Sequence, residues 1–436
     1  MFNFEAVPFL GKFITAFRNK MFFLEKSLDN VCNENIRLRF KIKTLNKEKI
    51  NVVYLCHRPA VWGSLKTVYE AMKTDDSFDV KIVTIPNKKQ LPKIGLNHEI
   101  YESEGADVFW KGEDVLSGYS YETNEWFDLR SLHPDYVCVQ QPYDICRPDF
   151  LKSWNICKYA KMFYIPYFTF LSNKMDDFVN DECNPIDFLK NLSFYFTQGE
   201  DAFLYVSKRL KITGNDNCQV VKSGFPVFDE INNSINNESN WNYPNEKKFR
   251  VIWTPRWCTN ENSCNFFEYK DLLIDYCRNK SDIDFIFRPH PQAFRNWISE
   301  KKMTEYELNE YKNIFSSSEN MKIDNDADYR GTFNSASCLV TDISSIIPEF
   351  FLTGKPIIYC NKMNSKNTFI KGKGITKGFY WVENWAELKA TLDMLRTGKD
   401  PLREKREELI KTEFYIPKEG AGYLIKEIIK KDFYNA

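Results

Sequence analysis

The sequence lacks several features that would place it in a simple class of protein. Its sixty basic and sixty acidic residues cancel, so a long-range attraction for nucleic acid is not expected. Its twelve cysteines are scattered without a Cys-x-x-Cys pair, and it has only four histidines, which argues against a zinc site or a disulfide framework. There is no apolar run near the roughly 18 residues that cross a bilayer, and the start has no basic leader. We therefore predict a cytoplasmic protein with no metal and no cofactor.

A length of 436 residues favours two domains with an appendage, and the 43% of hydrophobic residues suffices for two cores. From residue 51, short β-rich runs alternate with helical ones. Strands are predicted at 51–56, 79–85, 136–140, 162–165, 194–197, 249–254, 283–288, 338–341 and 356–360. Such alternation predicts an α/β fold with two parallel, Rossmann-like sheets facing a cleft. The predicted units are 1–49, 50–223, 224–417 and a final helix at 418–436, with an Asn-rich linker or exposed loop at 229–248.

The first 49 residues differ from the rest. Apolar residues recur there at alternating steps of four and three, which is the spacing of a coiled-coil seam, with Asn35 as its one polar member. This seam consists of Leu10, Ile14, Phe17, Met21, Leu24, Leu28, Val31, Asn35, Leu38, Ile42 and Leu45. Basic residues and phenylalanines are also abundant here. We predict a coiled-coil-like helix that joins copies of the chain through residues 10–45 and rests peripherally on the inner face of the cell membrane. The alternative is a helix that packs on its own domain.

Three motifs in the second half follow predicted strands and are rich in groups that bind phosphate. They are Trp253-Thr254-Pro255-Arg256-Trp257, Phe287-Arg288-Pro289-His290-Pro291 and Val340-Thr341-Asp342-Ile343-Ser344-Ser345. Arginine contacts phosphate oxygens through paired donors, and histidine donates a hydrogen bond or a proton. The serines precede a predicted helix at 344–352, whose free N–H groups favour an anion, although Ser344 also suits a plain helix cap. Glu349 is expected to reach a ribose or acceptor hydroxyl. The predicted site is therefore Arg256, Arg288, His290, Asp342, Ser344, Ser345 and Glu349.

These motifs, in this order, resemble the CDP-glycerol glycerophosphotransferase family, whose members build teichoic-acid and capsule polymers. The resemblance runs over about residues 199–430 and includes Gly224-Phe225-Pro226-Val227-Phe228-Asp229, Lys355-Pro356 and Lys418-Glu419-Gly420-Ala421-Gly422. It implies a GT-B fold, a CDP-linked alditol as donor, and transfer of an alditol phosphate to a hydroxyl of a polysaccharide or lipid-linked acceptor. It also implies that His290, Ser344 and Ser345 hold the donor pyrophosphate, and it makes residues 224–417 the donor domain and 50–223 the acceptor domain.

The first half departs from the family pattern, because it has no His-Gly-Thr motif to supply the base. The strand predicted at 51–56 ends in Cys56-His57-Arg58-Pro59, so we predict that His57 projects into the cleft and takes the acceptor proton, with Asp144 as the alternative. Two other functions remain open. One is a GT-B glycosyltransferase that uses a nucleotide sugar, and the other is a non-catalytic assembly factor organised by its coiled coil.

Overall fold

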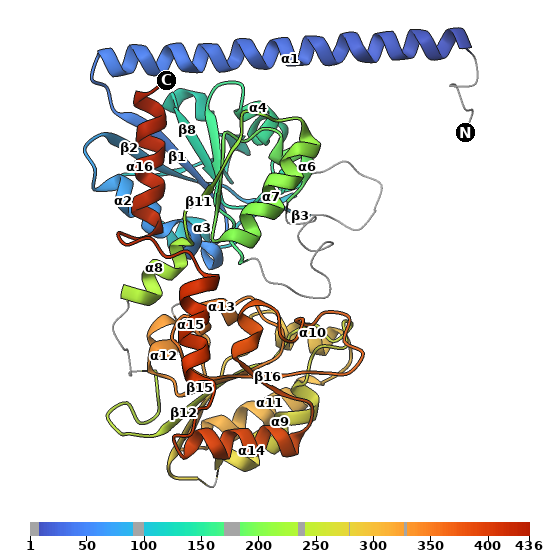
Figure 1. Ribbon diagram of the computed structural model, residues 1–436, viewed down its shortest axis with the longest axis vertical. Coiled ribbons are helices and arrows are strands. Elements are labelled where there is room, and N and C mark those ends of the chain that lie inside the picture. Colours follow the sequence, from blue (N-terminus) through green and yellow to red (C-terminus); the bar gives the residue numbers. More distant parts are fainter. Residues whose placement is uncertain (1–7, 90–99, 170–183, 234–239, 279, 327–328) are drawn as a thin grey trace.

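Two parallel β-sheets form the centres of two α/β bodies, one above the other in Figure 1. The computed structural model describes the chain except for residues 1–7, 90–99, 170–183, 234–239, 279 and 327–328. Strands of a parallel sheet are covered on both faces, which is why they form near-continuous apolar runs in the sequence. The predicted α/β class with two Rossmann-like sheets is confirmed.

The first sheet has seven strands in the described part of the chain, in the order β11-β10-β9-β8-β1-β2-β5. Its strands are β1 (Ile50–Cys56), β2 (Phe78–Thr84), β5 (Val115–Ser117), β8 (Tyr136–Val139), β9 (Lys161–Tyr164), β10 (Phe194–Thr197) and β11 (Gln219–Lys222). Val52 and Tyr54 of β1 pack into one core cluster, and Val53 and Leu55 pack into another on the opposite face. Two antiparallel pairs lie beside this sheet: β3 (Asn87–Lys89) with β4 (Ile100–Glu102), and β6 (Tyr119–Ser120) with β7 (Glu125–Trp126).

The second sheet has six described strands in the order β14-β13-β12-β15-β16-β17. They are β12 (Phe249–Thr254), β13 (Ile283–Phe287), β14 (Met321–Ile323), β15 (Cys338–Thr341), β16 (Ile357–Cys360) and β17 (Phe379–Val382). The three strands that precede the predicted phosphate motifs are neighbours in its middle, since β12 pairs with both β13 and β15.

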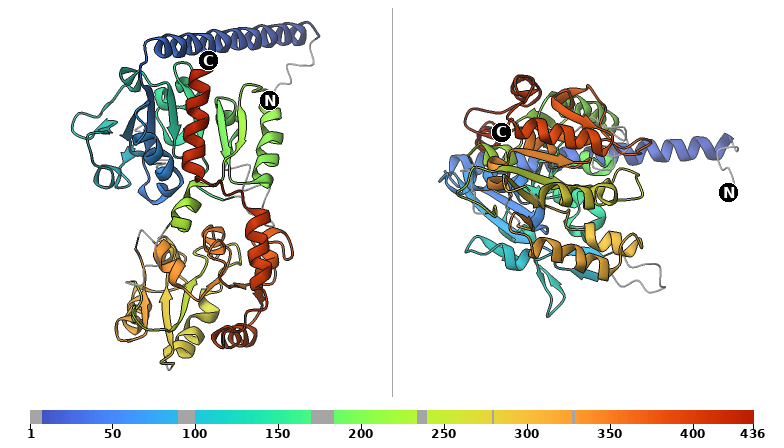
Figure 2. Two further views of the ribbon diagram at one scale, coloured as in Figure 1. Left: turned by 60° about the vertical axis from the view of Figure 1, so that its left-hand side comes forward. Right: turned by 90° about the horizontal axis from the view of Figure 1, so that it is seen from below.

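Helices cover both sheets (Figures 1 and 2). In the first half they are α1 (Pro8–Leu45), α2 (Gly63–Lys73), α3 (Ala106–Phe109), α4 (Ser153–Ile156), α6 (Ile186–Leu189), α7 (Glu200–Thr213) and α8 (Pro226–Asn233). In the second half they are α9 (Phe266–Arg278), α10 (Ala293–Ser299), α11 (Glu305–Ser316), α12 (Arg330–Ser335), α13 (Ile347–Phe351), α14 (Trp385–Arg396), α15 (Arg403–Glu413) and α16 (Ala421–Tyr434). Within the parts of the chain that are described, no helix is both long enough and apolar enough to cross a bilayer.

The last helix, α16, returns to the first body, as Figure 1 and the left view of Figure 2 show. Its buried Ile425, Ile429 and Phe433 belong to the same core cluster as β1. The start of α16 is held by Asp229, whose carboxylate accepts hydrogen bonds from the Ala421 N–H (2.8 Å) and the Gly422 N–H (2.9 Å). The chain therefore crosses between the bodies twice, near α8 and just before α16.

The linker predicted at 229–248 is wrong at its start, because α8 continues through residue 233 and Asp229 is only 8% exposed. Asp229 also accepts a hydrogen bond from the Thr67 hydroxyl of α2 at 3.0 Å. Trp241 is 2% exposed, so the described end of this segment is also anchored. The asparagines suggested a loop because they weaken helices, but burial of the apolar face of α8 offsets that weakness.

The N-terminal segment forms one helix of 38 residues, α1, whose C-terminal third lies on the first body (Figure 1). Ile36 and Phe40 are buried in the cluster that also contains α16. Lys43 pairs with the buried carboxylate of Asp135 at 2.5 Å. Packing of the helix on its own domain is thus observed for this third, whereas a coiled coil between copies is not tested by a single chain.

Candidate functional site

The site in the second body is built on the C-terminal ends of β12, β13 and β15. Because these strands are parallel neighbours, Arg256, His290 and Ser344 all follow the same edge of the sheet. This is the edge at which α/β sheets bind ligands. The structure therefore brings together three motifs that are about thirty and about fifty residues apart in the sequence.

Asp342 holds two of these loops in place. Its carboxylate accepts hydrogen bonds from the Arg256 N–H (3.1 Å) and from the N–H (2.8 Å) and side-chain amide (2.9 Å) of Asn265. Burial raises the pKa of Asp342 to about 6, against the opposing effect of the Asn265 donors. With its oxygens committed to protein donors and 1% exposure, Asp342 positions the site rather than facing a ligand.

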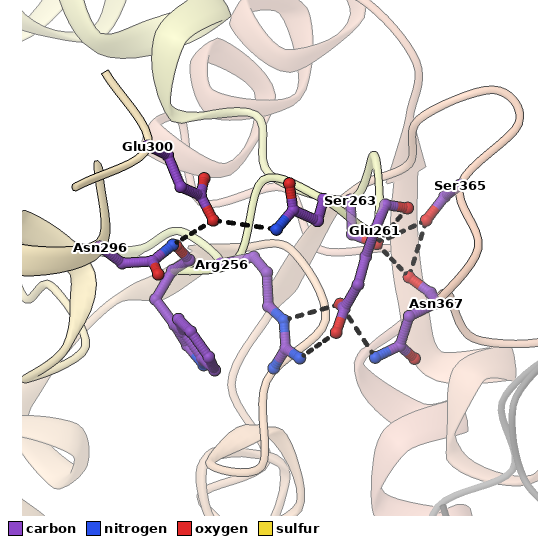
Figure 3. A network of polar contacts seen from close by, with 9 residues as sticks. Arg256, Glu261, Ser263, Asn296, Glu300, Ser365 and Asn367 are labelled. Atoms are coloured by element: carbon purple, nitrogen blue, oxygen red, sulfur yellow. Dashed lines mark hydrogen bonds and ion pairs between the residues drawn. The ribbon is translucent and has the colours of Figure 1, made fainter. Parts of the chain in front are cut away.

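Arg256 is held at the cleft by Glu261, as Figure 3 shows. The Glu261 carboxylate accepts from Nε at 3.0 Å and from Nη2 at 2.8 Å, and it also accepts from the Asn367 amide at 3.2 Å. This pairing orients the guanidinium and leaves the N–H groups of Nη1 directed away from the carboxylate. Arg256 is thus a pre-positioned donor for an anionic oxygen.

A second group in Figure 3 fixes the same loop from its other side. Glu300 accepts hydrogen bonds from the amides of Asn296 (2.9 Å) and Asn260 (3.1 Å). Ser263 and Ser365 share a hydrogen bond of 2.7 Å and join the loop to the segment after β16. Neither set was singled out in the sequence, where polar residues in a loop carry no distinctive signal.

His290 stands beside Arg256 and stacks on Trp257, with ring centroids 5.6 Å apart. Its Nδ1 accepts a hydrogen bond from the Gln292 N–H at 3.2 Å, so the proton of the neutral ring lies on Nε2. Although His290 reaches solvent, its partial burial disfavours the charged ring and lowers its pKa to about 4. The positive charges of Arg256 and then Arg58 lower this pKa further. His290 is therefore a neutral N–H donor at neutral pH. Arg58 belongs to the first body and His290 to the second, so the influence of Arg58 on the pKa of His290 indicates that these two residues lie near one another.

Arg288 lies deeper than predicted. Its Nη1 pairs with Asp324 at 2.7 Å, its Nη2 donates to the Asp326 carbonyl at 2.7 Å, and its guanidinium lies 4.8 Å from the Tyr329 ring centre. The side chain is 16% exposed, and its charge is already balanced by a buried carboxylate. This geometry favours a role in orienting the strand end that carries His290, and direct contact with a donor stays a prediction.

The serine motif differs in detail from the prediction. Helix α13 begins at Ile347, three residues later than expected, so Ser344 is not its N-cap. Ser344 Oγ instead accepts weakly from the Ile346 N–H at 3.5 Å, and Ser345 is exposed. The Ser345 carbonyl accepts from the hydroxyl of Thr169, in the first body, at 3.5 Å. The serine loop therefore lies where the two bodies meet.

Glu349 was expected to reach a ligand hydroxyl, but the structure buries it at 8% exposure. Its Oε2 accepts a hydrogen bond from the Tyr329 hydroxyl at 2.6 Å. Burial raises its pKa to about 7, opposed by the Tyr329 bond and by the charges of Arg330 and Arg288. The prediction is corrected, because the short helix turns Glu349 into the second body.

His57 follows β1 as predicted, but it is 3% exposed and does not project freely into the cleft. Among the described residues its Nε2 has no hydrogen-bond partner and is buried, while the ring bonds the Gln141 side chain. The Gln141 bond stabilises the protonated ring, so the ring is the donor in it. Because Nε2 has no partner among the described residues, the donor is Nδ1, and Nε2 of the neutral ring carries the lone pair. Burial, followed by the charge of Arg147, lowers the pKa of His57 to about 3, with a smaller contribution from Arg58.

Asp144, the alternative base, is engaged by three donors. They are Arg147 Nη2 at 2.5 Å, the Ser153 N–H at 2.8 Å and the Ser153 hydroxyl at 2.5 Å. Arg147 is 1% exposed and also donates to the Gln141 carbonyl at 2.9 Å. Arg147 therefore contacts Asp144 directly and also contacts Gln141, whose side chain bonds His57. In the sequence, only the position of Arg147 before Pro148 distinguishes it from other arginines.

A comparison with known families matches residues 211–376 to the CDP-glycerol:poly(glycerophosphate) glycerophosphotransferase family. The matched segment contains the motifs at Arg256, His290 and Ser344 and excludes those of the first body. No curated protein matches the sequence.

Solved structures share the fold at low identity. A histidine-to-alanine variant of the wall teichoic acid polymerase TagF has a TM-score of 0.57 and 14% identity, over 97% of this chain and 99% of that one. The UDP-GlcNAc 2-epimerase from Neisseria meningitidis bound to UDP-GlcNAc has a TM-score of 0.56 and 13% identity, over 89% and 100%. MnaA from S. aureus with UDP has a TM-score of 0.54 and 12% identity, over 88% and 96%. These likenesses place the two-sheet architecture among GT-B-type folds. The match at residues 211–376 covers less than half of the chain and carries the motifs at Arg256, His290 and Ser344, so this part of the chain is similar to the CDP-glycerol:poly(glycerophosphate) glycerophosphotransferase family.

Proposed function

We propose that the chain transfers an alditol phosphate from a CDP-linked alditol, such as CDP-glycerol, to a hydroxyl of a polysaccharide or lipid-linked acceptor. The observation that carries this proposal is that the family-matched segment contains all three strand ends of the candidate anion site. TagF, the polymerase of similar fold, has been solved after soaking with CDPG, which agrees with such a donor.

The reaction requires a new bond between the acceptor oxygen and the donor phosphorus that carries the alditol. The bond from that phosphorus to the CMP oxygen breaks, and CMP leaves with the added negative charge. In this proposal Arg256 Nη1 and the Nε2–H of His290 donate to the pyrophosphate oxygens, which is supported by the hydrogen bonds that orient both side chains, and the exposed Ser345 adds a further donor. Stabilising charge in this way supplies most of the rate in phosphoryl-type transfer.

The acceptor proton must pass to a base, and His57 fits this role better than Asp144. His57 has an unpaired Nε2, whereas both carboxylate oxygens of Asp144 accept hydrogen bonds. A base with a pKa near 3 is weak, but a bound pyrophosphate would bring negative charge toward Arg58 and His57. Such a charge raises the pKa of a nearby imidazole. Donor binding would thereby prepare the base.

Binding of CDP and CMP, set against UDP and GDP, tests the donor. We expect CDP or CDP-glycerol to raise the melting temperature of the wild type and of Arg295→Ala, which removes an exposed charge from α10. Arg256→Ala should lose most of that rise, and Arg256→Lys should restore only part of it, because lysine lacks the paired donors. A rise with UDP or GDP alone would favour the nucleotide-sugar glycosyltransferase instead. No binding by any nucleotide would favour the non-catalytic assembly factor.

Product mass spectrometry with a panel of CDP-alditols and acceptors would identify the transferred group and the acceptor. Contact of the basic, Phe-rich start with an anionic membrane stays a prediction, because residues 1–7 lie outside the described part of the chain.

A further inference from the structure

Helix α1 exposes an apolar stripe that the described residues of its own chain do not cover. Among its described side chains, nine large hydrophobic ones are exposed, and eight of them occupy the seam positions of the heptad pattern. These eight are Phe17, Met21, Leu24, Leu28, Val31, Leu38, Ile42 and Leu45, with exposed fractions from 42% to 82%. Only Phe23 among the nine lies off the seam. Among the side chains of α1 that are described, the exposure of large apolar residues therefore follows the coiled-coil spacing closely.

The part of α1 that touches the first body uses a different face. Ile36 and Phe40 are buried, and Arg39 donates to the carboxylate of Asp135 at 3.2 Å. Ile36 follows the seam residue Asn35 directly, and successive residues of a helix are turned by about 100°. The helix can thus rest on its own body and still present the seam outward. Figure 1 shows α1 continuing well beyond that body toward its N-terminus.

We propose that two copies of the chain pair along this stripe as a parallel, in-register, two-stranded coiled coil. The a positions are Ile14, Met21, Leu28, Asn35 and Ile42, and the d positions are Leu10, Phe17, Leu24, Val31, Leu38 and Leu45. Asn35 is exposed in the single chain and stands alone as a polar residue among them. In a parallel, in-register pair the two Asn35 side chains face each other and can share a hydrogen bond. Any other register or direction sets each against an apolar side chain, which is the known means of fixing register.

The flanking charges agree with this direction. In a parallel pair, the g residue of one helix faces the e residue five positions later in the other. Lys20 at g then faces Glu25 at e, which is an attractive pair. Glu34 at g faces Arg39 at e, although Arg39 is already committed to Asp135 within its own chain. No facing g and e positions in this helix carry like charges.

The stripe approaches the size of a specific interface. Side chains of this size bury on the order of 60–120 Å² each when they are fully exposed beforehand. These eight are about half exposed, so pairing two helices would remove roughly 500–1,100 Å² from the seam side chains alone. Specific interfaces need about 1,000 Å². The pairing does not depend on which donor the cleft binds. A parallel pairing would place the α/β bodies of both copies at the same end of the coiled coil.

Sedimentation of the full-length protein tests the pairing. We expect the wild type to be a dimer, and Leu24→Glu combined with Leu28→Glu to weaken the dimer by about 10⁴-fold, at roughly tenfold for each of the four buried leucines that the pair of helices loses. Both leucines are more than half exposed in the single chain, so the melting temperature of the bodies should not change. Asn30→Glu combined with Asn33→Glu, which adds the same charge off the seam, should remain dimeric. A monomeric wild type, or a dimer that survives the Leu24 and Leu28 changes, would overturn the proposal.

Direction and register need a separate experiment. Asn35→Cys is expected to form a covalent dimer under mild oxidation to a much greater extent than the wild type or Asn33→Cys. Of residues 33 and 35, only residue 35 lies on the seam and faces the same residue of the other helix. Equal cross-linking of both cysteine variants would refute the in-register arrangement. Flotation with vesicles containing anionic lipid distinguishes the other use of the stripe. A wild type that is monomeric in solution and floats, and that stops floating when Leu24 and Leu28 are changed, would show a membrane anchor instead of a dimer seam.

Discussion

Replacing His290 with alanine is expected to lower turnover by two to three orders of magnitude without unfolding the protein. The fold should survive because His290 is exposed, and its contacts are a stack on Trp257 and one hydrogen bond accepted from the Gln292 N–H. The change therefore removes a donor from the cleft with little effect on the core.

The magnitude follows from what that donor does. Loss of one pre-positioned hydrogen-bond donor to developing negative charge costs about 2.7–4 kcal/mol, or about 10²–10³ in kcat. Because the Gln292 N–H fixes the proton on Nε2, His290 is ready to donate before substrate arrives. His290→Gln keeps an N–H donor and should retain more activity than alanine does. Gln292→Ala, which leaves the backbone N–H in place, serves as the matched control.

The assay is turnover of CDP-glycerol over a range of pH, with melting temperature measured in parallel. The pKa of His290 is lowered to about 4, so its titration should not reduce kcat/KM as the pH rises from about 5 to 7. If His290 acted as a cation, kcat/KM would fall as the pH rises through about 6.5. A folded alanine variant with nearly wild-type turnover would refute the assignment of His290.

The remaining predictions concern the base, a buried acid and a close helix contact. His57→Gln should lose most of the turnover, and its kcat profile at saturating donor should lose the acidic limb. Asp144→Asn should chiefly lower the melting temperature, because it leaves the buried Arg147 poorly paired, at a cost on the order of 3 kcal/mol. Glu349 has a folded pKa of about 7, above its unfolded value of 4.5, so its contribution to stability is present below pH 4.5 and is lost as the pH rises through 7. Over that range, the free energy of unfolding of the wild type should fall relative to that of Glu349→Gln by at most about 3 kcal/mol, which denaturant titrations would measure. Gly422→Ala should lower the melting temperature markedly, because its Cβ would lie 2.6 Å from the Thr67 backbone.

Each of these has a control or a contrary result. Unchanged turnover in His57→Gln would make His57 structural. A stability difference for Glu349→Gln that does not vary with pH would contradict the raised pKa. Gly63→Ala, whose Cβ would meet its nearest atom at an ordinary 3.6 Å, should leave the melting temperature almost unchanged, and an equal loss in both glycine variants would refute the steric argument.

Much of the fold could be predicted because parallel strands carry their own signal. The ranges 194–197, 249–254 and 338–341 match β10, β12 and β15 residue for residue, since buried strands are short apolar runs bounded by polar turns. Shorter strands such as β11 and β14 were missed, because β11 is partly exposed and its pattern is weak. The helix at α8 was missed because asparagines suggested a loop, and its burial depends on α2 and α16, which are distant in sequence.

The site was predictable in position and less so in role. The ends of β12, β13 and β15 could be expected to meet, because parallel strands direct their C-terminal ends to one edge. The partners of each side chain could not. Asp324 neutralises Arg288, and Tyr329 turns Glu349 inward, through contacts that depend on how separate loops pack.

Residue types and their local spacing are enough to predict the α/β class, the family motifs and the heptad stripe of α1. The folded chain was needed to see that His57 is buried with no described partner for its Nε2, that His290 is a neutral donor, and that α16 completes the first body. The physical reason is that burial, pKa and hydrogen-bond partners are set by groups that the chain brings together from far apart, and local spacing carries no record of them.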